Sequence, residues 1–204
     1  MKIAKLVVAS HNQGKIDEIK KMLSPYQIEV LSARELNLPD VEETGTTFAE
    51  NAALKAEQLS AASGLPCLAD DSGLCVNALG GRPGVYSARY SEFEKDGKIE
   101  RDFSRGMDKL LAELAAANTA DRSAYFACVL AFKVPGEDCR FFEGRVNGTI
   151  AHKKSGDGGF GFDPLFIPDG FDKTFAHFTK DEKAAVSHRG RAFEKFINGV
   201  FNAD

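Results

Sequence analysis

The alternation of apolar and polar residues predicts strands and helices that take turns along the chain. Short apolar runs predict strands at residues 6–9, 28–31, 65–69, 125–134 and 140–146. Amphipathic or Ala- and Leu-rich stretches predict helices at residues 16–23, 48–62, 103–117 and 187–201. The turn at residues 135–138 joins the two late strands and indicates a hairpin. Early alternation followed by a hairpin predicts an α/β fold with a mixed sheet.

The second predicted helix carries clear signals at both ends. Thr47 and Glu50 fit a capping box at its start, and Gly64 follows its last turn. No repeat, linker or low-complexity segment interrupts the pattern, so we expect residues 1–204 to form a single domain.

The run Leu65-Pro66-Cys67-Leu68-Ala69-Asp70-Asp71-Ser72-Gly73 is the most informative segment. We expect its apolar strand to end in a turn, because Asp, Ser and Gly are common turn residues. Two adjacent carboxylates, however, repel each other unless a cation shares them. Oxygen ligands of this kind suit a hard divalent ion, Mg²⁺ or Mn²⁺, rather than zinc.

The segment Ser10-His11-Asn12-Gln13-Gly14-Lys15 lies between the first predicted strand and the first predicted helix. Helix N-terminal amides and a lysine at such a junction can hold a phosphate. The segment is not a P-loop, because the upstream glycine is absent and Ile16 stands where Ser or Thr would bind the metal. An ordinary helix start explains the segment equally well.

Two further groups lie around the second predicted helix. Glu42 and Glu43 precede it, either as solvated charges that favour the helix dipole or as additional metal ligands. Asn51 and Lys55 are one turn apart on it and could both reach a phosphate, although a solvated pair is the plainer interpretation.

Three later segments combine structural and functional signals. The Gly- and Pro-broken loop at residues 80–90 carries Arg82 and Arg89, which could clamp a polyphosphate. The run at residues 158–164 alternates glycine with phenylalanine, which suits a flat ligand, although one of the two rings is expected in the core. A helix start follows with Ser187 as N-cap beside His188 and Arg189, and a loop could bring Lys183 to it.

Composition narrows the class of protein. The chain has 204 residues, 43% of them hydrophobic and 27% charged, which is ordinary for a globular protein. A net charge of −4 gives no basic surface for nucleic acid, and no apolar stretch reaches membrane-spanning length. The four cysteines have no paired metal-ligand spacing, so we expect buried, reduced thiols and a cytoplasmic protein.

Seven motifs in this order resemble the inosine triphosphate pyrophosphatase family, almost from end to end. They are Ser10-x-Asn12-x-x-Lys15, Glu42-Glu43-Thr44-Gly45, residues 48–55, Ala69-Asp70-Asp71-Ser72-Gly73-Leu74, residues 81–89, Gly159-Phe160-Gly161-Phe162-Asp163-Pro164 and Ser187-His188-Arg189. The family usually has Tyr at Phe162 and often Thr at Ser10, and both changes keep the ring or the hydroxyl. His11 and Gln13 occupy variable positions of the pattern, so no catalytic role is assigned to them.

The resemblance implies an elongated mixed sheet with two α/β lobes around a central cleft, usually in a homodimer. It implies hydrolysis of dITP, ITP and XTP to the nucleoside monophosphate and pyrophosphate, with Mg²⁺ as cofactor and Mn²⁺ able to substitute. Asp71 would be the general base, and Glu42 or Glu43 would join Asp70 and Asp71 at the metal. The implied substrate residues are Ser10, His11, Asn12, Gln13, Gly14, Lys15, Asn51, Lys55, Ser72, Arg89, Phe160, Gly161, Phe162, Asp163, Lys183, His188 and Arg189.

The physical chemistry of the residues agrees with such a reaction. Water would attack the α-phosphorus, and positively charged groups would stabilise the departing pyrophosphate. Mg²⁺ would offset the triphosphate charge and lower the pKa of a bound water.

Two other classes of protein also use such residues. A haloacid dehalogenase-type phosphotransferase needs Asp-x-Asp after its opening strand, where this chain has Ala9-Ser10-His11, and a receiver domain needs a phosphoacceptor on another strand. A nucleotide sensor without activity would need the pocket but not the paired carboxylates, and a turnover assay with Mg²⁺ separates it from an enzyme.

Overall fold

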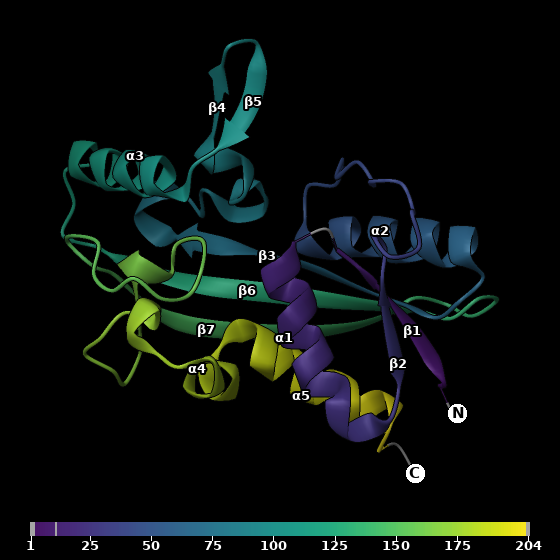
Figure 1. The fold of residues 1–204 in the computed structure, drawn as a ribbon. Coiled ribbons are helices and arrows are strands. Elements are labelled where there is room, and N and C mark those ends of the chain that lie inside the picture. Colours follow the sequence, from purple (N-terminus) through teal and green to yellow (C-terminus); the bar gives the residue numbers. More distant parts are fainter. Residues whose placement is uncertain (1–2, 11, 203–204) are drawn as a thin grey trace. The chain divides into compact units, whose positions relative to one another are not determined.

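A six-stranded sheet with the strand order β2-β1-β3-β6-β7-β8 is the centre of the fold, and β4 and β5 form a separate two-stranded sheet (Figure 1). The computed structural model describes residues 3–10 and 12–202. The strands are β1 Lys5–Ala9, β2 Glu29–Ser32, β3 Cys67–Val76, β4 Glu92–Lys95, β5 Lys98–Arg101, β6 Ser123–Lys133, β7 Arg140–Ile150 and β8 Phe166–Pro168. The α-helices are α1 Gln13–Leu23, α2 Phe48–Ser63, α3 Phe103–Ala116, α4 Lys180–Val186 and α5 His188–Val200. Short 3₁₀ turns lie at Ser24–Tyr26, Asn77–Leu79, Gly84–Tyr86, Arg89–Ser91, Asp163–Leu165 and Phe175–His177. The predicted α/β fold with a mixed sheet is confirmed.

The chain divides into two compact units, each assembled from segments that are distant in the sequence. The first unit comprises Met1–Asp71, Cys128–Glu143 and Ala192–Asp204, and the second comprises Ser72–Ala127 and Gly144–Arg191. Strands β3, β6 and β7 each contribute residues to both units.

The first unit is built around the parallel strands β1, β2 and β3, with helices on both faces (Figure 1). Leu6, Val8 and Leu68 share one buried cluster with residues of α1 and α5. Val7 and Ala69 belong to a second cluster with residues of α2. Successive strand residues point to opposite faces, so one strand supplies both clusters.

Helix α2 begins and ends as its sequence predicts. The hydroxyl of Thr47 accepts from the backbone of Glu50, whose carboxylate accepts from the backbone of Thr47, which completes the capping box. Gly64 ends the helix in the left-handed conformation at φ 68°, which costs glycine little.

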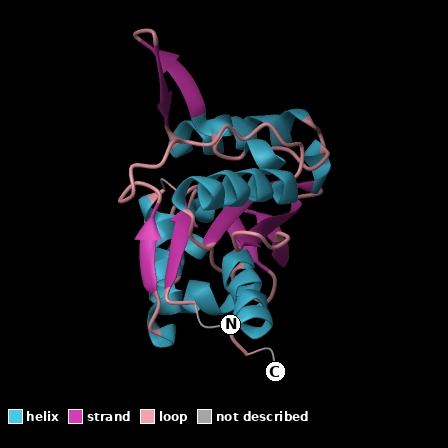
Figure 2. Ribbon diagram, turned by 90° about the vertical axis from the view of Figure 1, so that its right-hand side faces the viewer, coloured by secondary structure: helices cyan, strands magenta, loops and turns pink. Residues whose placement is uncertain are grey.

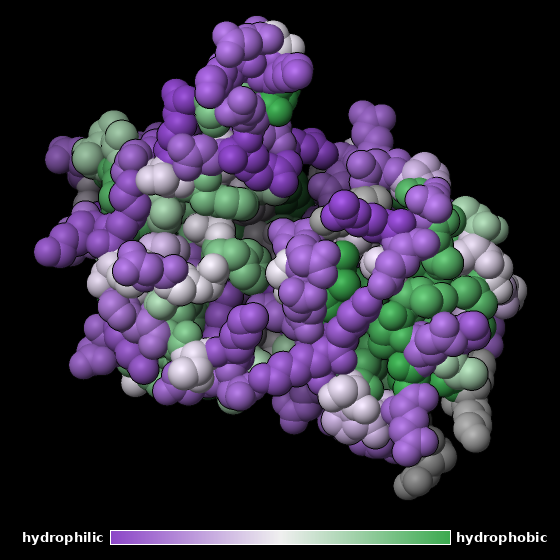
Figure 3. All heavy atoms as spheres, viewed as in Figure 1, coloured by the Kyte–Doolittle hydropathy of each residue, from purple (hydrophilic) through white to green (hydrophobic). Residues whose placement is uncertain are grey.

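The second unit has its own core of apolar residues from α3, the strands and the loops around them. Phe126, Phe166 and Phe175 lie at its centre, with ring centroids 4.8 Å apart for Phe126 and Phe166 and 5.3 Å for Phe166 and Phe175. The hairpin of β4 and β5 extends away from α3 of the same unit (Figures 1 and 2). The hairpin is largely hydrophilic on the face seen in Figure 3, although Ile99 is 69% exposed.

One predicted feature is wrong. The sequence predicts a turn at residues 70–73, but β3 continues through them to Val76. The strand can continue because both carboxylates find polar partners and because Leu74 and Val76 resume the buried apolar pattern beyond Gly73.

Other elements agree with the sequence to within a few residues, and some were not predicted. Helix α1 starts three residues earlier than predicted, and the late hairpin is confirmed as neighbouring strands β6 and β7. Helix α4 and strands β4, β5 and β8 were not predicted. Each is seven residues or shorter, which is too short for a clear periodic pattern of apolar residues.

The cysteines are free, as predicted. Cys67, Cys75 and Cys128 are buried, and Cys139 is half-buried. Within the described part of the chain, no helix combines the length and the apolar character needed to cross a membrane.

Candidate active site

Strand β3 directs Asp70 and Asp71 to opposite faces of the sheet. Leu68 belongs to the cluster with α1 and Ala69 to the cluster with α2, so Asp70 follows Leu68 and Asp71 follows Ala69 by the two-residue period of a strand. Both carboxylates are buried. The sequence predicts a single cation shared by both, whereas each carboxylate contacts a lysine of its own.

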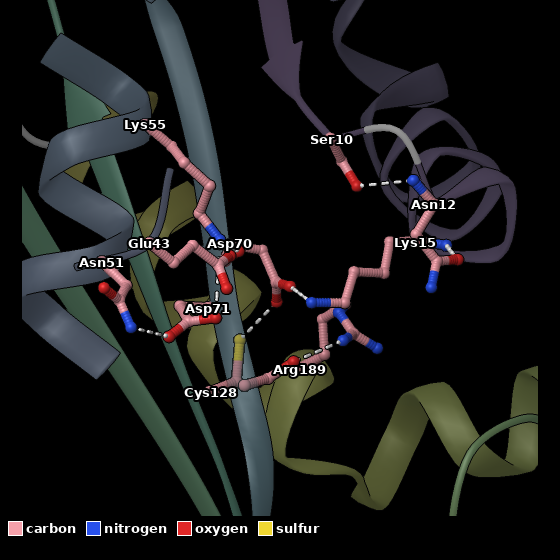
Figure 4. A network of polar contacts seen from close by, with 11 residues as sticks. Ser10, Asn12, Lys15, Glu43, Asn51, Lys55, Asp70, Asp71, Cys128 and Arg189 are labelled. Atoms are coloured by element: carbon pink, nitrogen blue, oxygen red, sulfur yellow. Dashed lines mark hydrogen bonds and ion pairs between the residues drawn. The ribbon is translucent and has the colours of Figure 1, made fainter. Parts of the chain in front are cut away.

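Asp70 lies on the α1 side of the sheet (Figure 4). Its side chain is fully buried and forms an ion pair with Lys15, in the first turn of α1. The thiol of Cys128 on β6 donates to Oδ2 of Asp70 at 3.0 Å. A buried carboxylate needs such partners, because an unpaired charge away from water is costly.

Asp71 lies on the α2 side and contacts two residues that are one turn apart on that helix (Figure 4). Asn51 donates to Oδ2 of Asp71 at 3.3 Å, and Lys55 Nζ lies 3.4 Å from Oδ1. Lys55 Nζ also lies 2.6 Å from Oε1 of Glu43 and donates to the backbone oxygen of Asp70 at 2.8 Å. Oxygen atoms of Glu43, Asp70 and Asp71 therefore surround the ammonium group of Lys55.

Burial sets the electrostatics of this group. It raises the pKa of Asp71 above the ordinary value, although the positive charges of Lys55 and Lys15 oppose the rise. Burial also acts to lower the pKa of Lys55, but Asp71 and Glu43 outweigh it and hold that pKa above its ordinary value. Asp71 is thus a carboxylate with increased proton affinity, as a general base requires.

The junction of β1 and α1 is ordered by local hydrogen bonds. The hydroxyl of Ser10 accepts from the backbone N–H of Asn12, and Asn12 caps α1 by accepting from the N–H of Lys15. Gln13 and Gly14 are exposed in the first helical turn, where Gln13 donates to Asp17. His11 lies outside the described residues.

In the second unit, Asp163 joins the Gly-Phe run to helix α4. Its Oδ2 accepts from the backbone N–H of Phe160 at 2.8 Å and lies 2.5 Å from Nζ of Lys183. Nζ of Lys183 also lies 4.2 Å from the ring centroid of Phe160, a cation–π distance. Lys183 and Asp163 are both buried, and Phe160 is half-buried.

The two phenylalanines of this run differ, as the sequence predicts. Phe162 is 2% exposed in the core of the second unit, so Phe160 has the more accessible ring. Gly161 lies between them with φ 65°, a conformation that glycine adopts readily.

His188 and Arg189 begin α5 and are buried, although a helix start usually leaves such residues solvated. Nη2 of Arg189 donates to the hydroxyl of Ser72 at 3.1 Å, and its guanidinium carbon lies 5.6 Å from the ring centroid of Phe160. The imidazole of His188 stacks on Phe126 with centroids 4.8 Å apart and planes 12° apart. Ser187 accepts from the N–H of Gly190, as expected of an N-cap.

Two residues of the predicted site remain outside these groups. Glu42 is exposed, in contrast to Glu43 at Lys55. Arg89 is also exposed, with its guanidinium carbon 5.8 Å from the Tyr86 ring centroid. A cavity of about 670 Å³ in the second unit has Arg122, Ser155 and His177 in its wall, and no predicted site residue is among the described residues that line it.

The donor set around Lys55 suits a hard cation. Among the described residues, no three His, Cys, Asp or Glu side chains converge in the arrangement of a complete metal site. The ammonium of Lys55, however, lies between the carboxylates of Glu43 and Asp71 and a backbone oxygen, so oxygen atoms already surround one positive charge here.

Sequence reasoning missed two contacts of the predicted residues. Cys128 follows Asp70 by 58 residues, and Phe126 precedes His188 by a similar distance. No local pattern connects such positions, because only the pairing of β3 with β6 brings Cys128 to Asp70.

The comparisons with known proteins agree with the order of the motifs. The sequence model of the Ham1 family matches residues 6–199. The chain belongs to the Ham1 family. The membership predicted from the seven motifs is therefore confirmed, and the match includes all of the charged residues described above.

Members of the Ham1 family resemble this chain over almost their whole length. A protein from Agrobacterium fabrum, named dITP/XTP pyrophosphatase, is 47% identical over 97% of this chain and 96% of its own. A protein of the same name from Bacillus subtilis is 45% identical over 93% of each chain. A HAM1 protein from Coxiella burnetii has a similar structure, with a TM-score of 0.88 at 38% identity over 98% of this chain and 100% of that one.

Proposed function

We propose that this chain hydrolyses non-standard purine nucleoside triphosphates, such as ITP, dITP and XTP, to the nucleoside monophosphate and pyrophosphate. The observation that carries the proposal is its near-complete match to Ham1 family proteins named dITP/XTP pyrophosphatase. The buried pairs of lysines and carboxylates in the first unit support a reaction on a highly charged phosphate substrate.

Asp71 is proposed as the general base. Its raised pKa favours removal of a proton from the attacking water, and its position beside Lys55 keeps the carboxylate oriented. Lys15 and Lys55 would contact the phosphates and stabilise the negative charge of the departing pyrophosphate. The N-terminal amides of α1 point to the same phosphate-binding role for residues 10–15.

Mg²⁺ is the proposed cofactor, with Mn²⁺ able to substitute. Glu43 and Asp71 are the side chains that would hold it on the α2 side of β3, beside the backbone oxygen of Asp70, and the exposure of Glu42 favours Glu43 of the two glutamates. When bound, such an ion offsets phosphate charge and makes water more acidic.

Residues of the second unit would recognise the base and sugar. Phe160 offers a half-buried ring for stacking, and Arg189 offers donors near that ring and near Ser72. Lys183 would act with them and is held by Asp163. A homodimer in the cytoplasm, without a nucleic acid partner, is part of the same proposal.

The products test the reaction directly. We expect purified protein with ITP and Mg²⁺ to release inosine monophosphate and pyrophosphate in equal amounts, because water attacks the α-phosphorus. Activity should disappear in EDTA and return with Mg²⁺ or Mn²⁺. Chromatography of the nucleotides, with a pyrophosphate assay before and after added inorganic pyrophosphatase, measures both results. Orthophosphate as the first product, or full activity in EDTA, would contradict the proposal.

Lys15→Ala is expected to weaken binding of every triphosphate alike, by about 10–100-fold, the size of one lost charge-assisted hydrogen bond. The same change leaves Asp70 buried without its lysine, so the free energy of unfolding should fall by about 3–5 kcal/mol. Lys15→Met with Asp70→Asn should recover most of that stability but not the affinity. Chemical denaturation and KM values for ITP, XTP and dITP measure the two effects.

Lys20→Ala is the matched control for Lys15. Lys20 lies on the same helix in an exposed pair with Glu35, so both stability and affinity should stay near the wild-type values. If Lys15→Ala weakened the binding of triphosphates with only one nucleobase, the result would contradict the proposed contact between Lys15 and the phosphates.

A further inference from the structure

We infer that Asn51 is a positioning residue, which fixes the Asp71 carboxylate and the loop that carries Glu43 in one geometry. The inference rests on the proposed function and assigns Asn51 a role different from the phosphate contact that the sequence predicts. The residue is 2% exposed, and both ends of its side-chain amide form hydrogen bonds within the protein.

The two hydrogen bonds of Asn51 determine how its amide is oriented. Oδ1 accepts from the backbone N–H of Gly45 at 2.8 Å, and Nδ2 donates to Oδ2 of Asp71 at 3.3 Å. A backbone N–H can only donate and an ionised carboxylate can only accept, so the reversed amide would lose both bonds. Asn51 therefore connects a backbone donor, the N–H of Gly45, with a side-chain acceptor, the carboxylate of Asp71.

These bonds close a ring of contacts around the proposed metal ligands. From Asp71 the ring passes through Lys55 to Glu43, along the chain to Gly45, and through Asn51 back to Asp71. Figure 4 shows its side chains, those of Asp71, Lys55, Glu43 and Asn51. Asn51 and Lys55 are one turn apart on α2, so a single rigid element holds both sides. The carboxylates of Asp71 and Glu43 are thereby fixed in relation to each other.

Gly45 shows how closely the loop approaches the helix. A methyl group at this position would lie 2.8 Å from Oδ1 of Asn51 and 2.6 Å from Cβ of Glu50. The next residues are also held, because the Glu50 carboxylate accepts from the backbone N–H groups of Thr46 and Thr47. The end of the loop is thus attached to the first turn of α2, and Glu43 lies two residues before the attachment.

Asn51 is uncharged, which suits a residue that positions the Asp71 carboxylate. Lys55 also contacts Asp71, but a second positive charge at the carboxylate would compete with a bound cation. An amide orients Oδ2 of Asp71 by a hydrogen bond and leaves the negative charge available. Hydrogen bonds that orient ligating carboxylates typically contribute 10–100-fold to metal affinity or activity.

The first test follows the Gly45 amide by NMR-detected hydrogen exchange in the whole protein. Wild-type Gly45 should exchange slowly, and Asn51→Ala and Asn51→Leu should speed its exchange at least tenfold. Asn51→Asp keeps the acceptor for Gly45 and should retain the protection. Fast exchange in the wild-type protein, or protection that persists in Asn51→Leu, would overturn the inference.

The second test measures Mn²⁺ binding, with the free ion followed by electron paramagnetic resonance. Asn51→Ala and Asn51→Leu should weaken Mn²⁺ binding about 10–100-fold. Ser60→Ala is the matched control, because Ser60 is also buried on α2 and donates a hydrogen bond to the Leu65 carbonyl, away from the carboxylates. It should lower the melting temperature as a structural change does, and leave Mn²⁺ affinity unchanged.

Neither measurement depends on catalytic turnover, so the role of Asn51 and the proposed reaction can be contradicted independently of each other. A wild-type protein that makes no pyrophosphate contradicts the reaction alone. Mn²⁺ affinity within twofold of wild type in Asn51→Leu, an equal loss in Ser60→Ala, or a wild-type protein that binds no Mn²⁺ overturns the role of Asn51.

Discussion

Asp71→Asn is expected to lower kcat for ITP by about 10²–10⁴-fold, the range typical for loss of a general base. The amide keeps the shape of the side chain but has a negligible affinity for the proton of the attacking water. It also removes a negative charge from the group around Lys55, which still has Glu43 as a partner. Steady-state kinetics at saturating Mg²⁺, with circular dichroism to establish folding, measures the effect.

Asp70→Asn is the matched control, because the two aspartates are neighbours on β3 but face different lysines. We expect it to change KM more than kcat, through the altered position of Lys15. Asp71→Asn with more than about a tenth of the wild-type kcat would contradict the role of base, since the expected range excludes it. Equal losses of kcat at both positions would also contradict it.

The second large effect concerns the nucleobase. We expect kcat/KM for ITP, dITP and XTP to exceed that for ATP by up to about 10⁴-fold. A 6-oxo purine presents an acceptor at the position where adenine presents an amino group. Arg189 can only donate, so adenine would leave a buried donor without a partner. Competition between ITP and ATP at low substrate concentration measures the ratio.

Variants of the second unit separate hydrogen bonding from stacking. Arg189→Ala should reduce the ratio of kcat/KM for ITP to kcat/KM for ATP. Arg189→Lys should retain part of that ratio, because lysine still donates hydrogen bonds. Phe160→Leu should weaken the binding of all nucleotides to a similar extent, because every base has a face that can stack on an aromatic ring. Equal kcat/KM for ATP and ITP in the wild-type protein would refute the argument from donors.

Local signals made much of the fold predictable. The capping box at Thr47 and Glu50, the left-handed Gly64 and the apolar spacing of α1 each depend on residues within one or two turns. The turn predicted at residues 70–73 failed because turn preferences describe an isolated segment. Lys15 and Lys55, distant in sequence, compensate the charges that keep Asp70 and Asp71 inside a strand.

The same limit applies to the candidate site. Its charged residues could be chosen from the sequence, because paired carboxylates and lysines in or next to the neighbouring predicted helices have recognisable chemistry. Their partners could not, since the Cys128 thiol and the Asn51 amide reach the carboxylates only through the packing of β6 and α2 against β3. Sequence spacing placed Asn51 beside Lys55 correctly but did not show that it faces the protein interior.

The division of the chain has a consequence for how such an enzyme can diverge. The residues proposed for phosphate chemistry belong to Met1–Asp71, whereas those proposed for the base belong to Ser72–Ala127 and Gly144–Arg191. Two buried clusters support the first set, and a third supports the second. Substitutions in the second set can therefore change the nucleobase specificity during evolution. The residues proposed for hydrolysis can stay the same.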